Sequence, residues 1–211
     1  PDYQLVENKD KQNFFEEFWK IKLDEKKGLT VVEIMNAIHE NQIKGMYILG
    51  ENPAMSDPDQ NHARAALANL DFLVVQDIFP TETSSFADVI LPASAWPEKD
   101  GTVTNTDRKV QIGRKAVPMP GDAKQDWWII KEIGVRMGLN WNYDSPKEIF
   151  NEMKNVMPSL NGITWERLEK EGAVCYPVDD ETSFGNEILF SEGFPTSSGK
   201  AKIVPADLMP P

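Results

Sequence analysis

Two apolar runs of the sequence, 46–49 and 72–75, each end in small, amide or acidic residues of the kind that bind nucleotides. The residues that follow them are Gly50, Glu51, Asn52, Gln76 and Asp77. A carboxylate at the end of a strand can accept hydrogen bonds from ribose hydroxyls or a base edge, and Gly50 lets the backbone approach a ligand closely. These are parts of a nucleotide site, although acidic residues and glycines also follow strands for purely structural turn reasons.

Other chemistry has little support in the sequence. There is no Gly-x-Gly-x-x-Gly fingerprint and no Walker lysine loop. His39 and His62 have no Cys or His at metal-ligand spacing, so we expect surface or packing roles for both. Cys175 is the single cysteine, which excludes an intrachain disulfide and suits a small buried hydrophobe better than a nucleophile. The residues alone therefore define neither a catalytic centre nor a metal site.

The elements that must position the strand-end residues are strands of a parallel sheet. A third apolar run at 89–91 follows the first two, and the segments between the runs are too long for hairpins. Continuous apolar strands are typical of sheets covered on both faces. We predict an α/β fold, a Rossmann-like parallel sheet with helices on both faces and an irregular C-terminal extension. Such sheets bind ligands outside the carboxyl ends of their strands.

Capping signals place the helices around this sheet. Thr30, with Glu33 three residues later, predicts a capping box. Asp57 followed by Pro58 predicts the start of a helix that continues to Leu70. The remaining predicted elements are helices at 14–19, 126–137, 146–156 and 164–170, a long functional loop at 92–111, a short strand marked by Val110 and Ile112, another at 200–204, and a frayed end at 205–211.

Composition limits the partners. The chain has 34 acidic and 22 basic residues and a net charge of −12, which argues against nucleic acid because phosphate contacts need Lys and Arg. No apolar run approaches the roughly 20 residues that span a bilayer, so we expect no membrane insertion. The chain opens with Pro1 and has no leader, and we expect a segment cut from a longer protein. We predict an N-terminal helical extension at 1–28, an α/β dinucleotide-binding domain at 29–140, and a helical and loop extension at 141–211.

Six short motifs, ordered and correctly spaced, resemble the molybdopterin oxidoreductase family. They are Gly50-Glu-Asn-Pro53, Val75-Gln-Asp-Ile-Phe79, Ala87-Asp-Val-Ile-Leu-Pro92, Glu98-Lys-Asp-Gly101, Thr104-Asn-Thr-Asp-Arg108 and Ala123-Lys-Gln-Asp-Trp-Trp128. Within the family, the chain looks most like an internal domain of the alpha (catalytic) subunit of cytoplasmic formate dehydrogenases. The resemblance covers nearly the whole chain and is clearest over residues 45–138.

The resemblance implies a domain that grips one molybdopterin guanine dinucleotide. The parent enzyme would oxidise formate to carbon dioxide at molybdenum or tungsten held between two such dinucleotides, with iron–sulfur clusters elsewhere. By resemblance, Glu51 lies at the nucleotide, Gln76 and Asp77 meet the guanosine end, Lys99 lies near the phosphates or base, and Asp126 binds guanine. The implied partners are the remaining domains of the parent subunit and electron-transfer subunits.

The family's metal-ligating cysteine or selenocysteine, iron–sulfur cysteines and catalytic arginine have no counterpart here. We therefore expect no catalytic or metal-binding residue in this chain, and no formate dehydrogenase activity from it alone. The stretch 196–201 resembles the entry to the family's C-terminal barrel. One alternative is a cofactor-free scaffold, as in a related respiratory-complex subunit. For Asp126, the alternative from the residues alone is a cap on the 126–137 helix.

Overall fold

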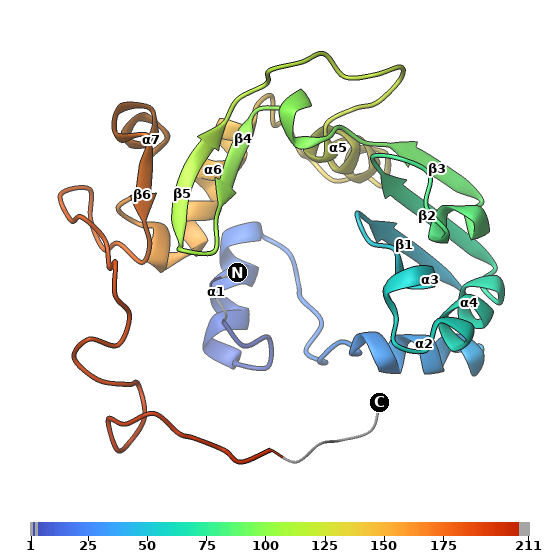
Figure 1. Ribbon diagram of the computed structural model, residues 1–211, viewed down its shortest axis with the longest axis horizontal. Coiled ribbons are helices and arrows are strands. Elements are labelled where there is room, and N and C mark those ends of the chain that lie inside the picture. Colours follow the sequence, from blue (N-terminus) through green and yellow to red (C-terminus); the bar gives the residue numbers. More distant parts are fainter. Residues whose placement is uncertain (1, 3, 207–211) are drawn as a thin grey trace.

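The first sheet is parallel and forms one side of the molecule (Figure 1). The computed structural model describes residues 2 and 4–206. β1 (Gly45–Leu49) pairs in parallel with β2 (Phe72–Asp77), which pairs in parallel with β3 (Val89–Pro92). The predicted parallel α/β arrangement is confirmed. Because all three strands run the same way, Leu49, Asp77 and Pro92 end at one edge of the sheet.

Helices α2 (Val31–His39), α3 (Pro53–Ser56) and α4 (Gln60–Ala68) pack with the parallel sheet; together these elements are called the parallel-sheet unit. The buried side chains between them are apolar, so burial itself drives this packing. They are Met35, Ile38, Ile48, Ala54, Ala63, Ala66, Leu67, Leu73 and Val75. The rings of His39 and His62 lie at the contact between α2 and α4, with their centroids 4.2 Å apart.

A second, antiparallel sheet joins distant parts of the chain. β4 (Gly101–Thr104) pairs with β5 (Lys109–Gly113), and β5 pairs with β6 (Ala173–Cys175), both antiparallel. Since β6 lies far beyond residue 140, this sheet links the predicted dinucleotide-binding range to the C-terminal one. The division at residues 28 and 140 stays a prediction.

Helices α6 (Pro146–Val156) and α7 (Trp165–Glu171) pack with this sheet, and these elements form the antiparallel-sheet unit. The other helices are α1 (Lys9–Trp19) and α5 (Asp126–Arg136), with short 3₁₀ turns at η1 (Thr83–Phe86), η2 (Trp96–Glu98) and η3 (Pro158–Leu160). The core of the unit is Val110, Phe150, Leu160, Ile163, Trp165, Leu168, Val174 and Val178. Within the described part of the chain, no helix is long and apolar enough to cross a bilayer.

The predicted capping box is confirmed. Thr30 and Glu33 form both halves of the capping box on α2. The side-chain oxygens of Ser145 and Thr164 accept hydrogen bonds from backbone N–H groups at the starts of α6 and α7. Cys175 is a buried free cysteine, as expected.

Other predicted boundaries are wrong. The N-cap of α4 is Asp59, whose carboxylate accepts from the N–H of His62 at 3.0 Å, whereas Asp57 binds the N–H of Asp59 at 3.0 Å. The predicted long loop contains β4, which pairing with β5 stabilises despite its polar sequence. Residues 200–204 form no strand, because no described strand pairs with them. The predicted frayed end lies outside the described residues except for Pro205 and Ala206.

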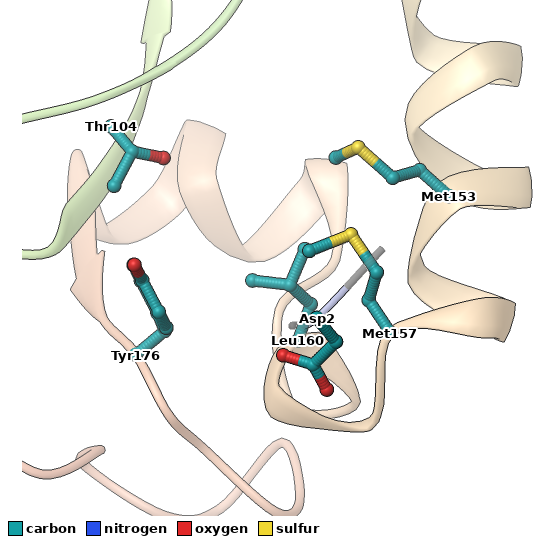
Figure 2. Close-up of a pocket in the computed structure, with 6 residues that line it drawn as sticks. All are labelled: Asp2, Thr104, Met153, Met157, Leu160 and Tyr176. Atoms are coloured by element: carbon teal, nitrogen blue, oxygen red, sulfur yellow. The ribbon is translucent and has the colours of Figure 1, made fainter. Parts of the chain in front are cut away.

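The N-terminal residues bind to the antiparallel-sheet unit. The Asp2 carboxylate accepts from the backbone N–H of Ser159 at 3.1 Å, and the Gln4 side chain donates to the carbonyl of Val156 at 3.0 Å. Figure 2 shows Asp2 beside a cavity of about 300 Å³. Its lining, apart from Asp2 itself, comprises Thr104, Met153, Met157, Leu160 and Tyr176, which are mostly apolar and bear no second charge.

The tight packing at Gly162 yields a stability prediction. A Cβ atom at this position would lie 2.2 Å from the carbonyl oxygen of Asp180 and 2.8 Å from Val178 Cγ2. We expect Gly162→Ala to lower the free energy of unfolding by about 1–3 kcal/mol, the usual cost of overpacking. Urea denaturation measures the change, with Gly28→Ala as the control, because nothing lies within 4 Å of a Cβ there. Equal destabilisation by the two variants would contradict this account.

Candidate functional site

A buried amide, an ammonium and a carboxylate meet on the parallel sheet near the carboxyl ends of its strands. Gln76 lies in β2 and is 0% exposed, and its Nε2 donates to Asp126 Oδ1 at 2.7 Å. The Nζ of Lys99 donates to the other carboxylate oxygen of Asp126. It also donates to the carbonyl oxygen of Ser94, at a distance of 3.0 Å. Both oxygens of Asp126 are therefore held by donors. Three predicted site residues that are far apart in sequence come together here.

Local structure explains how these side chains reach one another. The strand register pairs Gln76 with both Leu49 and Leu91, so Gln76 occupies the middle of the sheet. Lys99 follows η2, where the Glu98 carboxylate accepts from the backbone N–H of Ala95 at 2.8 Å and closes the turn. Asp126 is the first residue of α5.

Asp126 does not cap α5. The N-cap of the helix is Gln125, which forms no side-chain cap hydrogen bond, and the Asp126 carboxylate binds Gln76 and Lys99. A carboxylate in the first turn is nevertheless favoured there by the helix dipole. The position thus stabilises a negative charge whose oxygens bind side chains from outside the helix.

A fourth residue, Tyr47 in β1, completes what we call the Asp126 cluster: Tyr47, Gln76, Lys99 and Asp126. The hydroxyl of Tyr47 donates to Gln76 Oε1. Tyr47 is 41% exposed, but desolvation of its hydroxyl, and then the negative charge of Asp126, raise the pKa of Tyr47 above its ordinary value, so the hydroxyl remains a neutral donor. Sequence reasoning missed Tyr47. Strand alternation is the available signal, since it places Tyr47 and Gln76 on the same face of adjacent strands.

A cavity of about 230 Å³ adjoins Lys99 and Asp126. Lys99, Asp100 and Asp126 contribute its charges, and the wall near them includes Trp127 and apolar side chains of α6. The α6 residues on the wall are Pro146, Ile149, Phe150 and Met153. A pocket with apolar walls and a few placed polar groups suits a flat heterocycle that carries hydrogen-bond donors along one edge.

The remaining predicted site residues lie at the ends of β1 and β2. Gly50 has a φ of +64°, a conformation that favours glycine, and its N–H donates to the carbonyl of Gln76 at 2.9 Å. The Asp77 carboxylate accepts from the N–H of Ile78 at 2.7 Å. Glu51 is exposed, and no hydrogen bond of its carboxylate is recorded within the described part of the chain.

Asn52 has a structural role in η1. Its Oδ1 accepts from the N–H of Thr83 at 3.1 Å and from the Thr83 hydroxyl at 2.7 Å, and its Nδ2 donates to Glu82 at 2.7 Å. The amide therefore ties the end of β1 to η1. Across residues 2 and 4–206, no three His, Cys, Asp or Glu side chains are grouped to hold a metal ion.

Comparison with known proteins places this site in a family. The family model described as molybdopterin oxidoreductase matches residues 8–136, which include all of the parallel sheet and the Asp126 cluster. A solved structure of acetylene hydratase from Pelobacter acetylenicus has a TM-score of 0.57 and 25% identity, covering 90% of this chain and 26% of that one. The α/β fold and its match define a domain of an oxidoreductase. The chain belongs to the molybdopterin oxidoreductase family.

Within the family, the chain is similar to formate dehydrogenase alpha subunits. It is 49% identical to the F420-dependent formate dehydrogenase subunit alpha of Methanocaldococcus jannaschii, over 98% of this chain and 30% of that protein. It is 41% identical to the putative formate dehydrogenase YrhE of Bacillus subtilis, over 100% of this chain and 21% of that protein. The chain is thus part of a formate dehydrogenase alpha-like molybdopterin oxidoreductase, and it spans less than a third of these relatives.

Proposed function

We propose that this chain binds the guanine end of a molybdopterin guanine dinucleotide. The observation that carries the proposal is the Asp126 carboxylate, held by Gln76 and Lys99 at the edge of a cavity walled in part by Trp127. The family supplies the cofactor class, because its members are molybdopterin enzymes by description. The site supplies the chemistry that selects one end of that cofactor.

Guanine fits this donor and acceptor set. It presents N1–H and N2–H₂ side by side, and one carboxylate can accept from both in charge-assisted hydrogen bonds. Adenine lacks that pair of donors, so the same carboxylate favours guanine over adenine. The ring faces would pack on Trp127 and the apolar wall from α6. Asp126 is thus the guanine-binding residue in this proposal.

The other residues take supporting positions. The ammonium of Lys99 is available to phosphate oxygens as well as to Asp126, because a lysine head group donates three hydrogen bonds. Glu51 and Asp77, at the strand ends, would accept hydrogen bonds from ribose hydroxyls. Gly50 leaves the backbone open to a ligand at the same edge.

The parent protein would be a formate dehydrogenase that oxidises formate to carbon dioxide. Its molybdenum or tungsten would supply the redox chemistry, while this chain's residues would bind and orient the nucleotide. We further propose a cytoplasmic enzyme whose other domains and electron-transfer subunits are this chain's partners. The similarity to formate dehydrogenase alpha subunits supports these proposals.

Binding of guanine nucleotides tests the proposal. The probes are GDP and ADP, titrated calorimetrically into the 211-residue chain, because both carry the same diphosphate. We expect GDP to bind at least about tenfold more tightly, since the adenine edge leaves carboxylate oxygens without donors. Equal affinities, or no binding of either nucleotide, would overturn the guanine site and support the scaffold alternative.

A further inference from the structure

Gln76 is placed too deeply to meet a ligand directly. Its side chain is 0% exposed, and both ends of its amide are already engaged, Oε1 by Tyr47 and Nε2 by Asp126. A buried amide with two satisfied ends acts on its neighbours, because breaking either bond would leave a buried polar atom without a partner. Resemblance placed Gln76 at the guanosine end, and the geometry suggests that it acts there through Asp126.

Asp126 needs such a support. The first N–H groups of a helix lack intrahelical acceptors, and a nearby carboxylate is the usual side chain to satisfy them. The N-cap residue of α5 forms no side-chain cap, so the N–H groups of the first turn would attract the Asp126 carboxylate if no other donors held it. Gln76 and Lys99 hold it on the cavity side instead.

Tyr47 in turn holds the side-chain amide of Gln76 in position. Among the described residues, its hydroxyl is the donor recorded for Gln76 Oε1. Removing this hydroxyl leaves a buried acceptor without a partner, and the amide would then move to find another donor. Any such movement shifts Nε2, the atom that holds Asp126 Oδ1. A hydroxyl on β1 is therefore connected to the carboxylate on α5 through one buried amide.

We propose that Tyr47 and Gln76 are positioning residues that set the orientation of the Asp126 carboxylate and hence the guanine selectivity of the site. This inference rests on the proposed function. A bidentate contact to N1–H and N2–H₂ needs both carboxylate oxygens correctly aimed, whereas a contact to N1–H alone needs only one. A misoriented Asp126 carboxylate therefore weakens the hydrogen bond from the 2-amino group most.

The test compares the affinities of Tyr47→Phe and of the unsubstituted chain for GDP and for inosine diphosphate, which lacks the 2-amino group. We expect Tyr47→Phe to bind GDP about three- to tenfold more weakly, the scale of one hydrogen bond. The ratio of GDP to inosine diphosphate affinity should fall toward one. A purely structural role for the hydroxyl would weaken both ligands equally and leave that ratio unchanged.

Tyr143→Phe is the matched control. The hydroxyl of Tyr143 donates to a carboxylate oxygen of Glu152 at 2.5 Å, at a position outside the Asp126 cluster. Burial and this carboxylate raise its pKa to about 12, so it is also a neutral donor. We expect this variant to keep the preference of the unsubstituted chain for GDP over inosine diphosphate.

A second measurement does not depend on ligand binding. In nuclear magnetic resonance spectra, the side-chain amide protons of Gln76 should exchange slowly with solvent, and Tyr47→Phe should accelerate that exchange. If the unsubstituted chain prefers GDP to inosine diphosphate and Tyr47→Phe keeps the same preference, the positioning role is overturned but the guanine site stands. If the unsubstituted chain shows no preference, the proposed function is overturned. Unchanged exchange of the Gln76 amide protons in Tyr47→Phe would then also overturn the link between Tyr47 and Gln76.

Discussion

Asp126→Asn is expected to weaken guanine dinucleotide binding by about 1.5–3 kcal/mol, the scale of a hydrogen bond to a charged group. The substitution keeps the size of the side chain but replaces one acceptor oxygen with an amide donor. That donor must face Gln76 Nε2, Lys99 Nζ or the guanine edge, all of which are donors themselves. The expected loss corresponds to about 10- to 150-fold in affinity.

Folding stability should change much less in this variant. The Lys99 and Asp126 side chains are 26% and 28% exposed, and ion pairs that reach solvent contribute little to stability. Calorimetric titration of the dinucleotide into the full-length parent, beside thermal unfolding of this chain, separates the two effects. Asp122→Asn is the control, because it removes the same charge from an exposed residue four positions earlier. Unchanged affinity with a markedly lower melting temperature would show that Asp126 has only a structural role.

Arg167→Met is expected to lower the free energy of unfolding by about 2–4 kcal/mol. The Arg167 side chain is only 7% exposed, and its guanidinium donates to the carbonyl oxygens of Gly162 at 2.8 Å and Ser183 at 2.6 Å. It also donates to a carboxylate oxygen of Glu171 at 3.0 Å. Methionine retains the apolar stem but leaves these acceptors without a charged donor.

The measurement is urea denaturation followed by tryptophan fluorescence, since Trp165 lies in the core of the antiparallel-sheet unit. Arg136→Met serves as the control, because the Arg136 side chain is 70% exposed and pairs with Glu132 on the surface of α5. We expect the free energy of unfolding of that variant to be almost the same as that of the unsubstituted chain. A similarly small effect of Arg167→Met would mean that water replaces the guanidinium at no cost.

Both units contribute residues to the proposed site. The parallel-sheet unit supplies Tyr47 and Gln76, whereas the cavity wall beyond Trp127 comes from α6 of the antiparallel-sheet unit. α5 begins between these contributions and carries Asp126. Changes that loosen the antiparallel-sheet unit, such as Arg167→Met, are therefore expected to reduce nucleotide affinity indirectly, by disturbing the wall.

Local signals in the sequence were sufficient for the strands of the parallel sheet and for several helix starts. Apolar runs predict β1, β2 and β3 because continuous apolar runs are typical of strands in parallel sheets. Capping residues predict the start of α2 because the cap satisfies N–H groups within a few residues. The family resemblance also rests on local motifs, and the family match confirms it.

Tertiary structure decided what local signals left open. β4 forms in a polar segment because β5 offers it a partner, and Asp59 rather than Asp57 caps α4 because Asp57 ends α3. The sequence leaves two roles for Asp126, helix cap or ligand, since either uses the same carboxylate. Only the fold brings Gln76 from 50 positions away to within 2.7 Å of it, and only strand register brings Tyr47 to Gln76. Hydrogen bonds between side chains so distant in sequence depend on the packed sheet, because no local backbone preference encodes them.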